Sequence, residues 1–377
     1  MFRSSLRLGA SATLLFLAVG CPHRTPVWSP DGSYIVVLAG KSGEEIDKAA
    51  SQLWLVEPAV GTAKALACPE KDVRYLAAAW VDDATIAVLT GIWKLGSIDA
   101  GSEKLWRVPA RGGDWAAVPA PPPSGENAPK KPPVVIGEGA TRAIVYPSDA
   151  EAVVVADFAA GKELLKLDPA ELIGPGPAGG FLVSRPQADD AATIEVTAYG
   201  ADLKVLWRRK LSDLREGIAR KLGKQPLEVV FNATGTSELP RAGEAGWIGL
   251  ELIFSDVGWK DGIPGYFARL DVKTGEVMEA ARAVGLSGRP AVASGVIWAV
   301  LAPDKKQSLP PRVARIQLAD GKEAGGMALA GVEKEAVHGY SLGPAGKIFA
   351  VSVNSPTPSL RLFDIVNPAN TKVIELK

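Results

Sequence analysis

A short apolar strand followed by a polar turn recurs along the chain. Each copy opens with an apolar run of about five residues, and in complete copies a glycine stands eight positions after the run begins. Glycine adopts positive φ without steric cost, so the pattern predicts a strand that enters a tight hairpin turn. Complete copies run from Leu53 to Gly61, Leu105 to Gly113, Val153 to Gly161, Phe267 to Gly275 and Val313 to Gly321. Weaker copies begin at Ile194, with Asp202 at the glycine position, and at Leu360, with Pro368 there.

A second pattern of strand, polar turn and strand precedes the first at three places. It reads Trp28-Ser29-Pro30-Asp31-Gly32 before the apolar run 35–38, Trp80-Val81-Asp82-Asp83 before 86–89, and Leu342-Gly343-Pro344-Ala345-Gly346 before 348–351. Proline presets φ and glycine closes the bend, so each copy predicts a turn between two strands. Two such hairpins make a four-stranded unit.

The spacing of the copies predicts the architecture. Successive starts are 52, 48, 41, 73, 46 and 47 residues apart. A four-stranded propeller blade needs about 40–50 residues. We therefore predict an all-β β-propeller with about seven four-stranded blades over residues 28–377. Six or eight blades also fit the spacing, because the 73-residue interval has room for another.

The string Trp28-Ser29-Pro30-Asp31-Gly32 and the strand after it resemble the repeat of TolB-type, WD-like β-propellers. The best match covers residues 27–67, with decaying copies over most of the remainder. The resemblance implies a binding role, because that family docks an envelope lipoprotein through its propeller. The segment 270–275 and the pair Leu206-Trp207 look like pieces of the quinoprotein-type repeat, which implies a BamB-like outer-membrane assembly factor as the alternative.

Three segments depart from the strand pattern. Residues 119–133 contain seven prolines, so they predict a surface loop between blades two and three, with a partner-docking arm as the alternative. Leu214, Ile218 and Leu222 share one face of a short helix from Ser212 to Gly223, which opens an expected insertion at 212–247. The capping box Ser42-Gly43-Glu44-Glu45 predicts a short helical excursion in blade one.

The N-terminal residues predict where in the cell the protein is located. Arg3 and Arg7 precede a short uncharged apolar run at 12–19, which is typical of a signal peptide spanning residues 1–20. The end of this run, Leu17-Ala18-Val19-Gly20-Cys21, resembles the bacterial lipobox, and an ordinary secretory peptide is the alternative. The resemblance implies that Cys21 is lipidated and begins a tether, 21–27, to the cell envelope. The outer membrane, on its periplasmic side, is favoured over the inner membrane.

The composition restricts the classes of partner and cofactor that the protein is expected to bind. Lys plus Arg and Asp plus Glu both number 42, so the chain has no net field to attract nucleic acid. The only two cysteines are Cys21 and Cys68, and lipid on the first would leave the second without a disulfide partner. With two histidines, His23 and His338, the sequence offers no metal-ligand set, and it carries no nucleotide-binding loop, so we expect no metal and no cofactor.

The string Gly339-Tyr340-Ser341-Leu342-Gly343 matches the nucleophile elbow of hydrolases. In those enzymes the catalytic His follows the Ser, and here no His follows Ser341. We therefore expect no catalytic residue. The enzymatic alternative is a propeller lyase or glycosidase that uses carboxylates around the central channel.

The ten tryptophans divide into two groups. We expect those at strand positions of the repeat to pack between blades: Trp28, Trp54, Trp80, Trp106 and Trp298. Those in or near irregular, glycine-rich segments are candidates for partner binding: Trp93, Trp115, Trp247 and Trp259. The last two bracket 235–262, the expected functional loop region. The sequence thus predicts a lipid-anchored, non-enzymatic scaffold that binds an envelope protein.

Overall fold

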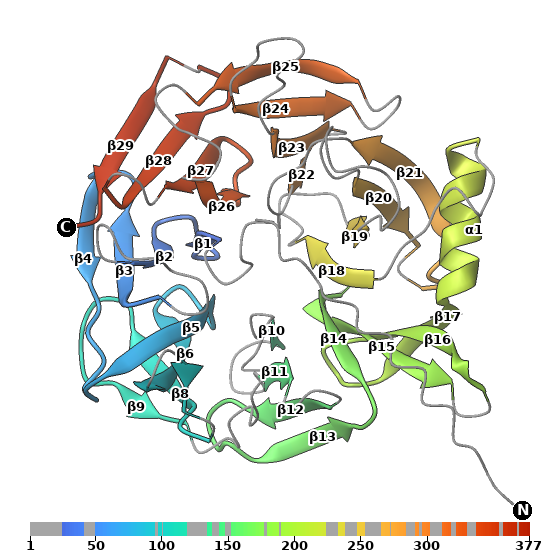
Figure 1. The fold of residues 1–377 in the computed structure, drawn as a ribbon, viewed down its shortest axis with the longest axis horizontal. Helices are drawn as coiled ribbons and strands as arrows, with labels where there is room; N and C mark the ends of the chain where they lie inside the picture. The colour runs from blue at the N-terminus through green and yellow to red at the C-terminus, as the bar shows by residue number, and fades with distance from the viewer. Residues whose placement is uncertain are drawn as a thin grey trace, which may run out of the picture.

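The structure is a computed structural model. It describes residues 25–40, 50–94, 97–99, 101–118, 134–137, 143–147, 152–176, 179–187, 190–223, 233–237, 247–252, 265–271, 273–283, 291–293, 296–301, 311–317, 322–329, 337–353, 357–367 and 369–377. The described strands form seven antiparallel sheets arranged as a ring, and in each sheet consecutive strands run from the centre to the rim (Figure 1). The predicted all-β propeller of four-stranded blades is confirmed.

The first four blades take up the N-terminal half of the ring. Blade one consists of β1 (Val27–Trp28), β2 (Ile35–Ala39), β3 (Gln52–Glu57) and β4 (Thr62–Ala65). Blade two consists of β5 (Val73–Trp80), β6 (Thr85–Lys94), β8 (Lys104–Pro109) and β9 (Ala116–Ala117), with β7 (Ser97–Ile98) added to β6. Blade three consists of β10 (Val134–Ile136), β11 (Ala143–Pro147), β12 (Val153–Asp157) and β13 (Glu163–Leu167). Blade four consists of β14 (Glu171–Pro175), β15 (Phe181–Gln187), β16 (Asp190–Tyr199) and β17 (Val205–Lys210).

The remaining three blades complete the ring. Blade five consists of β18 (Ala233–Ser237), β19 (Trp247–Leu252), β20 (Gly265–Leu270) and β21 (Val277–Ala283). Blade six consists of β22 (Ala291–Ala293), β23 (Val296–Leu301), β24 (Arg312–Gln317) and β25 (Glu323–Ala328). Blade seven consists of β26 (Val337–Leu342), β27 (Ile348–Val353), β28 (Ser359–Asp364) and β29 (Thr371–Glu375).

The sequence repeats mark fixed places in these blades. All seven copies of the strand–turn pattern begin in the third strand of a blade. In the five copies whose glycine position is described, this position falls in the connection that leads to the fourth strand. The three strand–turn–strand patterns connect first to second strands in blades one, two and seven. Gly275 illustrates the turn: its φ is +69°, and a Cβ would lie 2.5 Å from the ring of Trp207 in blade four. The glycine therefore permits both the turn and the close approach of the neighbouring blade.

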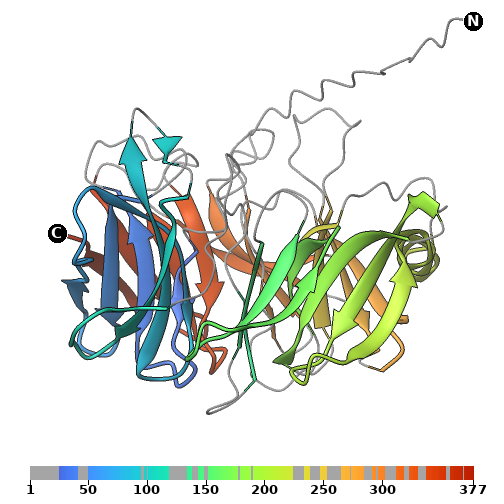
Figure 2. The same cartoon turned by 90° about the horizontal axis from the view of Figure 1, so that it is seen from below.

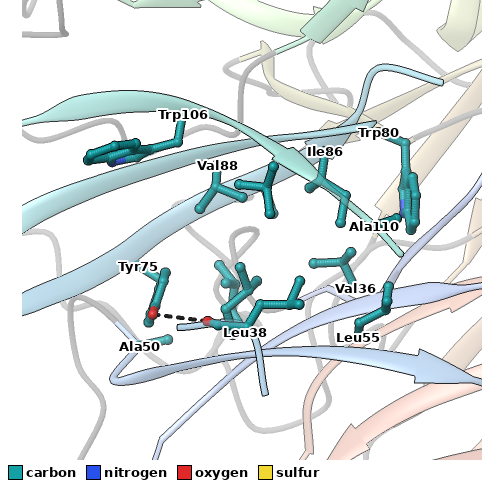
Figure 3. Close-up of a cluster of buried hydrophobic side chains, with 14 residues drawn as sticks. Val36, Leu38, Ala50, Leu55, Tyr75, Trp80, Ile86, Val88, Trp106 and Ala110 are labelled. Atoms are coloured by element: carbon teal, nitrogen blue, oxygen red, sulfur yellow. Dashed lines mark hydrogen bonds between the residues drawn. The ribbon is translucent and has the colours of Figure 1, made fainter. Parts of the chain in front are cut away.

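The core lies between blades, where each sheet buries both faces. In β2, Val36 and Leu38 join a cluster with blade two, whereas Ile35, Val37 and Ala39 join a cluster with blade seven. A strand buried on both faces needs a continuous apolar sequence, and β2 reads Ile-Val-Val-Leu-Ala. Figure 3 shows the cluster between blades one and two, to which both sheets contribute.

The tryptophans expected to pack between blades do so. Trp80 and Trp106 lie in the cluster shared with blade one, and the Trp80 indole donates a hydrogen bond to the Val27 carbonyl at 2.8 Å. Trp54 is buried against blade seven, and Trp28 is partly buried against the same cluster. Trp298 packs into the cluster between blades six and seven. Large rings thus fill the gaps between twisted sheets.

The helix predicted at Ser212–Gly223 is present as α1 (Leu211–Lys221). Leu214 and Ile218 are buried in the cluster between blades four and five, and Figure 1 shows α1 outside the ring beside β21. Strand β18 also lies inside the expected insertion 212–247 and is the first strand of blade five. The 73-residue interval between the repeat starts at Ile194 and Phe267 therefore contains helix α1 and the first two strands of blade five, β18 and β19.

Ring closure joins the two ends of the propeller. Blade seven and blade one are each built from consecutive strands, so in the described part of the chain no strand is exchanged between them. Side chains hold the seam instead: the Ser341 hydroxyl donates to the Pro26 carbonyl at 2.6 Å, and Lys372 Nζ donates to the Pro58 carbonyl at 3.0 Å. Ile374 and Leu360 also pack against strands of blade one.

Several expectations fall outside the described residues: the signal peptide and Cys21, the capping box at 42–45, the proline-rich loop 119–133, and Trp259. Of the region 235–262, only strand positions are described. Within the described ranges, no helix has the length and apolar character needed to cross a membrane.

We expect the closing seam to depend on buried apolar contact. Ile374 is 4% exposed and Val373, the next residue along β29, is 55% exposed. Ile374→Ala should lower the free energy of unfolding by about 2–5 kcal/mol because it leaves a cavity, whereas Val373→Ala should change it by less than about 0.5 kcal/mol. Urea denaturation of both variants measures the difference, and equal losses would show that the seam is not held by this packing.

Candidate functional site

A raised hairpin distinguishes one end of blade two. We call this end the blade-two crest and define it as residues 72–74, 91–94, 97–99 and 102–103. Strand β6 continues past the start of β5 and pairs there with β7, through Trp93↔Ile98 and Lys94↔Ser97. In Figure 2 this hairpin, coloured cyan, stands clear of the neighbouring strands of its blade. The crest therefore offers side chains to a partner that approaches this face of the ring.

Local hydrogen bonds fix the hairpin. The Trp93 N–H donates to the Asp72 carbonyl at 3.0 Å, and the Asp99 N–H donates to the Ile92 carbonyl at 2.8 Å. The Ser102 hydroxyl accepts a bond from the Ile92 N–H at 2.9 Å and donates to the Asp99 carbonyl. An exposed ion pair, Lys94–Asp99, spans the hairpin end. Exposed pairs of this kind add about 0–1 kcal/mol, so the backbone bonds carry most of its order.

Trp93 is the aromatic residue of the crest. Its ring is half-buried against a small cluster of Leu76, Ala77 and Leu89. The Arg74 guanidinium carbon lies 5.4 Å from the ring centroid, within the range of a cation–π contact. A tryptophan that keeps part of its ring exposed beside a cation suits the centre of a protein interface.

Trp115 lies on the opposite face of the same blade. Its ring packs edge-on against Trp106, with centroids 6.0 Å apart, and belongs to the cluster shared with blade one. This environment is that of a packing residue. The two candidate tryptophans of blade two, Trp93 and Trp115, are therefore not brought together.

Trp247 is far along the ring from both of these residues, in β19 of blade five, where its backbone pairs with Arg269. Its side chain and the whole of Trp259 lie outside the description. No common surface formed by the four candidate tryptophans can be drawn from the described residues. Trp93 alone stands at a raised edge.

Three groups of blades one and two have shifted pKa values. Burial raises the pKa of the Cys68 thiol, which keeps it protonated. Burial also raises the pKa of Tyr75, whose hydroxyl donates to the Leu66 carbonyl and accepts from the Cys68 N–H, each at 3.1 Å. In the turn between β1 and β2, the Ser29 hydroxyl donates a hydrogen bond to Asp31 and holds the pKa of that carboxyl below its usual value. These shifts favour structural roles for the three groups.

Sequence reasoning missed Glu103. Its side chain is 2% exposed, and neither carboxylate oxygen has a hydrogen-bond partner. A carboxylate this deeply buried is normally paired. The available signal was its position two residues before Leu105, since alternate residues of a strand share a face and Leu105 is buried between blades two and three.

The centre of the ring bears on the enzymatic alternative. In the described innermost strands, Glu171 of β14 is the one carboxylate. Glycoside hydrolysis uses a pair of carboxyl groups, so a second acid would have to come from outside these strands. Among the described residues, no group of three or more His, Cys, Asp or Glu side chains could hold a metal ion. Ser341 of the elbow-like string lies in β26, where its hydroxyl bonds the Pro26 carbonyl.

Comparison with known proteins supports the fold. No family model matches the chain, and no curated protein matches it. One similar solved chain comes from the crystal structure of a mitotic checkpoint complex, with a TM-score of 0.52 and 12% identity. The match covers 91% of this chain and 89% of that chain. At this identity the likeness shows the architecture, which is that of a WD-like β-propeller.

We expect Gly91 to be required for the crest. A Cβ at this position would lie 2.6 Å from Ile98 Cγ2, so Gly91→Ala should push the hairpin outward at about 1–3 kcal/mol. Hydrogen exchange at the Trp93 and Asp99 amides should accelerate accordingly. In an Ile98→Ala background the same change should cost little, and an equal cost in both backgrounds would contradict this explanation.

Proposed function

We propose that this protein is a non-enzymatic scaffold that binds a protein partner through the blade-two crest. The observation that carries the proposal is the half-buried Trp93 ring at the end of a raised hairpin, beside Arg74. Tryptophan and arginine are the residue types that dominate binding energy at protein interfaces. The similarity to a chain from a protein complex supports the same class of function.

The scaffold function includes an anchor. Lipid on Cys21 would tether the propeller to the cell envelope through residues 21–27. Each buried methylene of an acyl chain contributes about 0.8 kcal/mol, so several chains hold a protein at a membrane without a spanning helix. A tether at the N-terminus leaves the propeller free to present the crest to an envelope protein.

Partner binding can be tested by crosslinking in intact cells. A photo-reactive amino acid in place of the exposed Lys94 should capture a protein, and Trp93→Ala in the same chain should reduce capture about tenfold or more. Trp93→Phe, which keeps an aromatic ring, should retain most of the capture. The matched control places the photo-reactive residue at Val366, an 80% exposed position of blade seven, where no Trp93-dependent capture is expected.

Two results would contradict the scaffold function at this site. One is a level of capture at Lys94 that Trp93→Ala leaves unchanged. The other is recovery of a small metabolite, with no protein, by the intact chain.

The anchor is tested separately by membrane fractionation. Cys21→Ser removes the sulfur that would carry lipid, so the variant should move from the membrane to the soluble fraction. Cys68→Ser is the control, because that half-buried thiol belongs to the propeller and its loss should leave the distribution unchanged. Cys21→Ser protein that stays with the membrane would show that lipid on this residue is not the anchor.

A further inference from the structure

The least satisfied polar group at the crest is Glu103. It is 2% exposed, and both of its carboxylate oxygens lack a hydrogen-bond partner. An ionised carboxylate loses several kcal/mol of hydration on burial unless donors or a cation replace the water. Folding alone does not explain why an acid is kept at this position.

Strand register places Glu103 within the crest. Lys104 pairs with Thr90, so Glu103 stands across from Gly91, and paired residues point to the same face of a sheet. The space over Gly91 is filled by Ile98 and Leu76, whose methyl carbons lie 2.6 Å and 3.5 Å from where a Cβ would be. The carboxylate therefore lies at the base of the hairpin beside apolar side chains, where an electrostatic contact is strengthened.

The cations of the crest are engaged elsewhere. Lys104 points to the other face and pairs with Glu70. Lys94 pairs with Asp99 at the hairpin end. Arg74 shares the row of Glu103 across β6, but its guanidinium lies over the Trp93 ring. The crest thus contains an acidic group to which none of the described side chains supplies a hydrogen bond.

We infer that Glu103 recognises a basic side chain, arginine or lysine, of the protein partner. This inference rests on the scaffold function proposed for the crest. A guanidinium or ammonium group would supply charge-assisted hydrogen bonds to both free oxygens, and the Trp93 face would add a cation–π contact. Access requires movement of Ile98, which belongs to the β6–β7 hairpin and is held there by two ladder pairs. A neutral side chain could donate hydrogen bonds to the carboxylate but would not balance a negative charge on it, so the site favours a cationic side chain.

The charge requirement can be tested with short peptides on the full folded chain. The probes are a peptide with one central arginine, its lysine analogue, and its citrulline analogue, which has nearly the shape of arginine without the charge. Binding is followed by NMR through the Trp93 indole N–H resonance. The arginine and lysine peptides should bind saturably, and the citrulline peptide should bind at least tenfold more weakly.

Glu103→Gln is the decisive variant, because glutamine keeps the shape and removes the charge. The Kd of the arginine peptide should rise at least tenfold, whereas Glu163→Gln on the exposed strand β13 should leave it unchanged. The same variant should unfold at a higher temperature, by about 2–4 °C, since it removes a buried unpaired charge. A purely structural acid would lose stability on this change and leave binding unaltered.

The outcomes separate this inference from the scaffold function. Equal Kd values for native protein and Glu103→Gln, equal binding of arginine and citrulline peptides, or no binding of any peptide would each overturn the role of Glu103. If Trp93-dependent capture at Lys94 persists in that case, the crest still binds a partner by other contacts. If capture also fails, both proposals fall.

Discussion

The fold depends on the burial of both faces of every blade by the two neighbouring blades. A four-stranded sheet alone would expose the apolar residues of strands such as β2, and only a closed ring covers them all. The seam between blades seven and one joins residues that are more than three hundred positions apart in the chain, so its closure carries the entropy cost of a long loop. Hydrophobic contact at this seam, together with the hydrogen bonds from Ser341 and Lys372, closes the ring of seven blades.

A closed ring leaves the ends of the blades free to vary. The residues inside the strands pack against neighbouring blades, so insertions are tolerated in the connections between strands. Helix α1 is one such addition, and the β6–β7 hairpin is another. The additions differ in what they bury: α1 fills the outer edge of a seam with Leu214 and Ile218, whereas the hairpin keeps part of Trp93 at the surface. This difference makes the hairpin the better candidate for contact with another protein.

The crest combines features that stability alone does not select. An aromatic ring and a cation stand at its surface, and an acid is buried at its base. The hairpin is held by backbone hydrogen bonds, by Ser102 and by the Lys94–Asp99 pair, and the Glu103 carboxylate makes no hydrogen bond to it. Buried polar groups are normally hydrogen-bonded, and departures from this rule are expected at functional sites, which makes the buried acid of the crest a candidate for contact with a ligand.

The amino-acid sequence by itself determined the blades. The strand–turn repeats, the glycine at Gly275 and the helix near Leu214 depend on local backbone preferences and on short-range alternation, which a linear pattern records. The tertiary structure decided which contacts each half-buried tryptophan makes and which acid is unpaired, because these depend on neighbours from other strands and blades. Trp93 and Trp115 look alike in sequence, yet one packs into a seam and the other stands at an edge. The burial of a side chain is set by the assembled sheets and cannot be derived from the spacing of residues in the sequence.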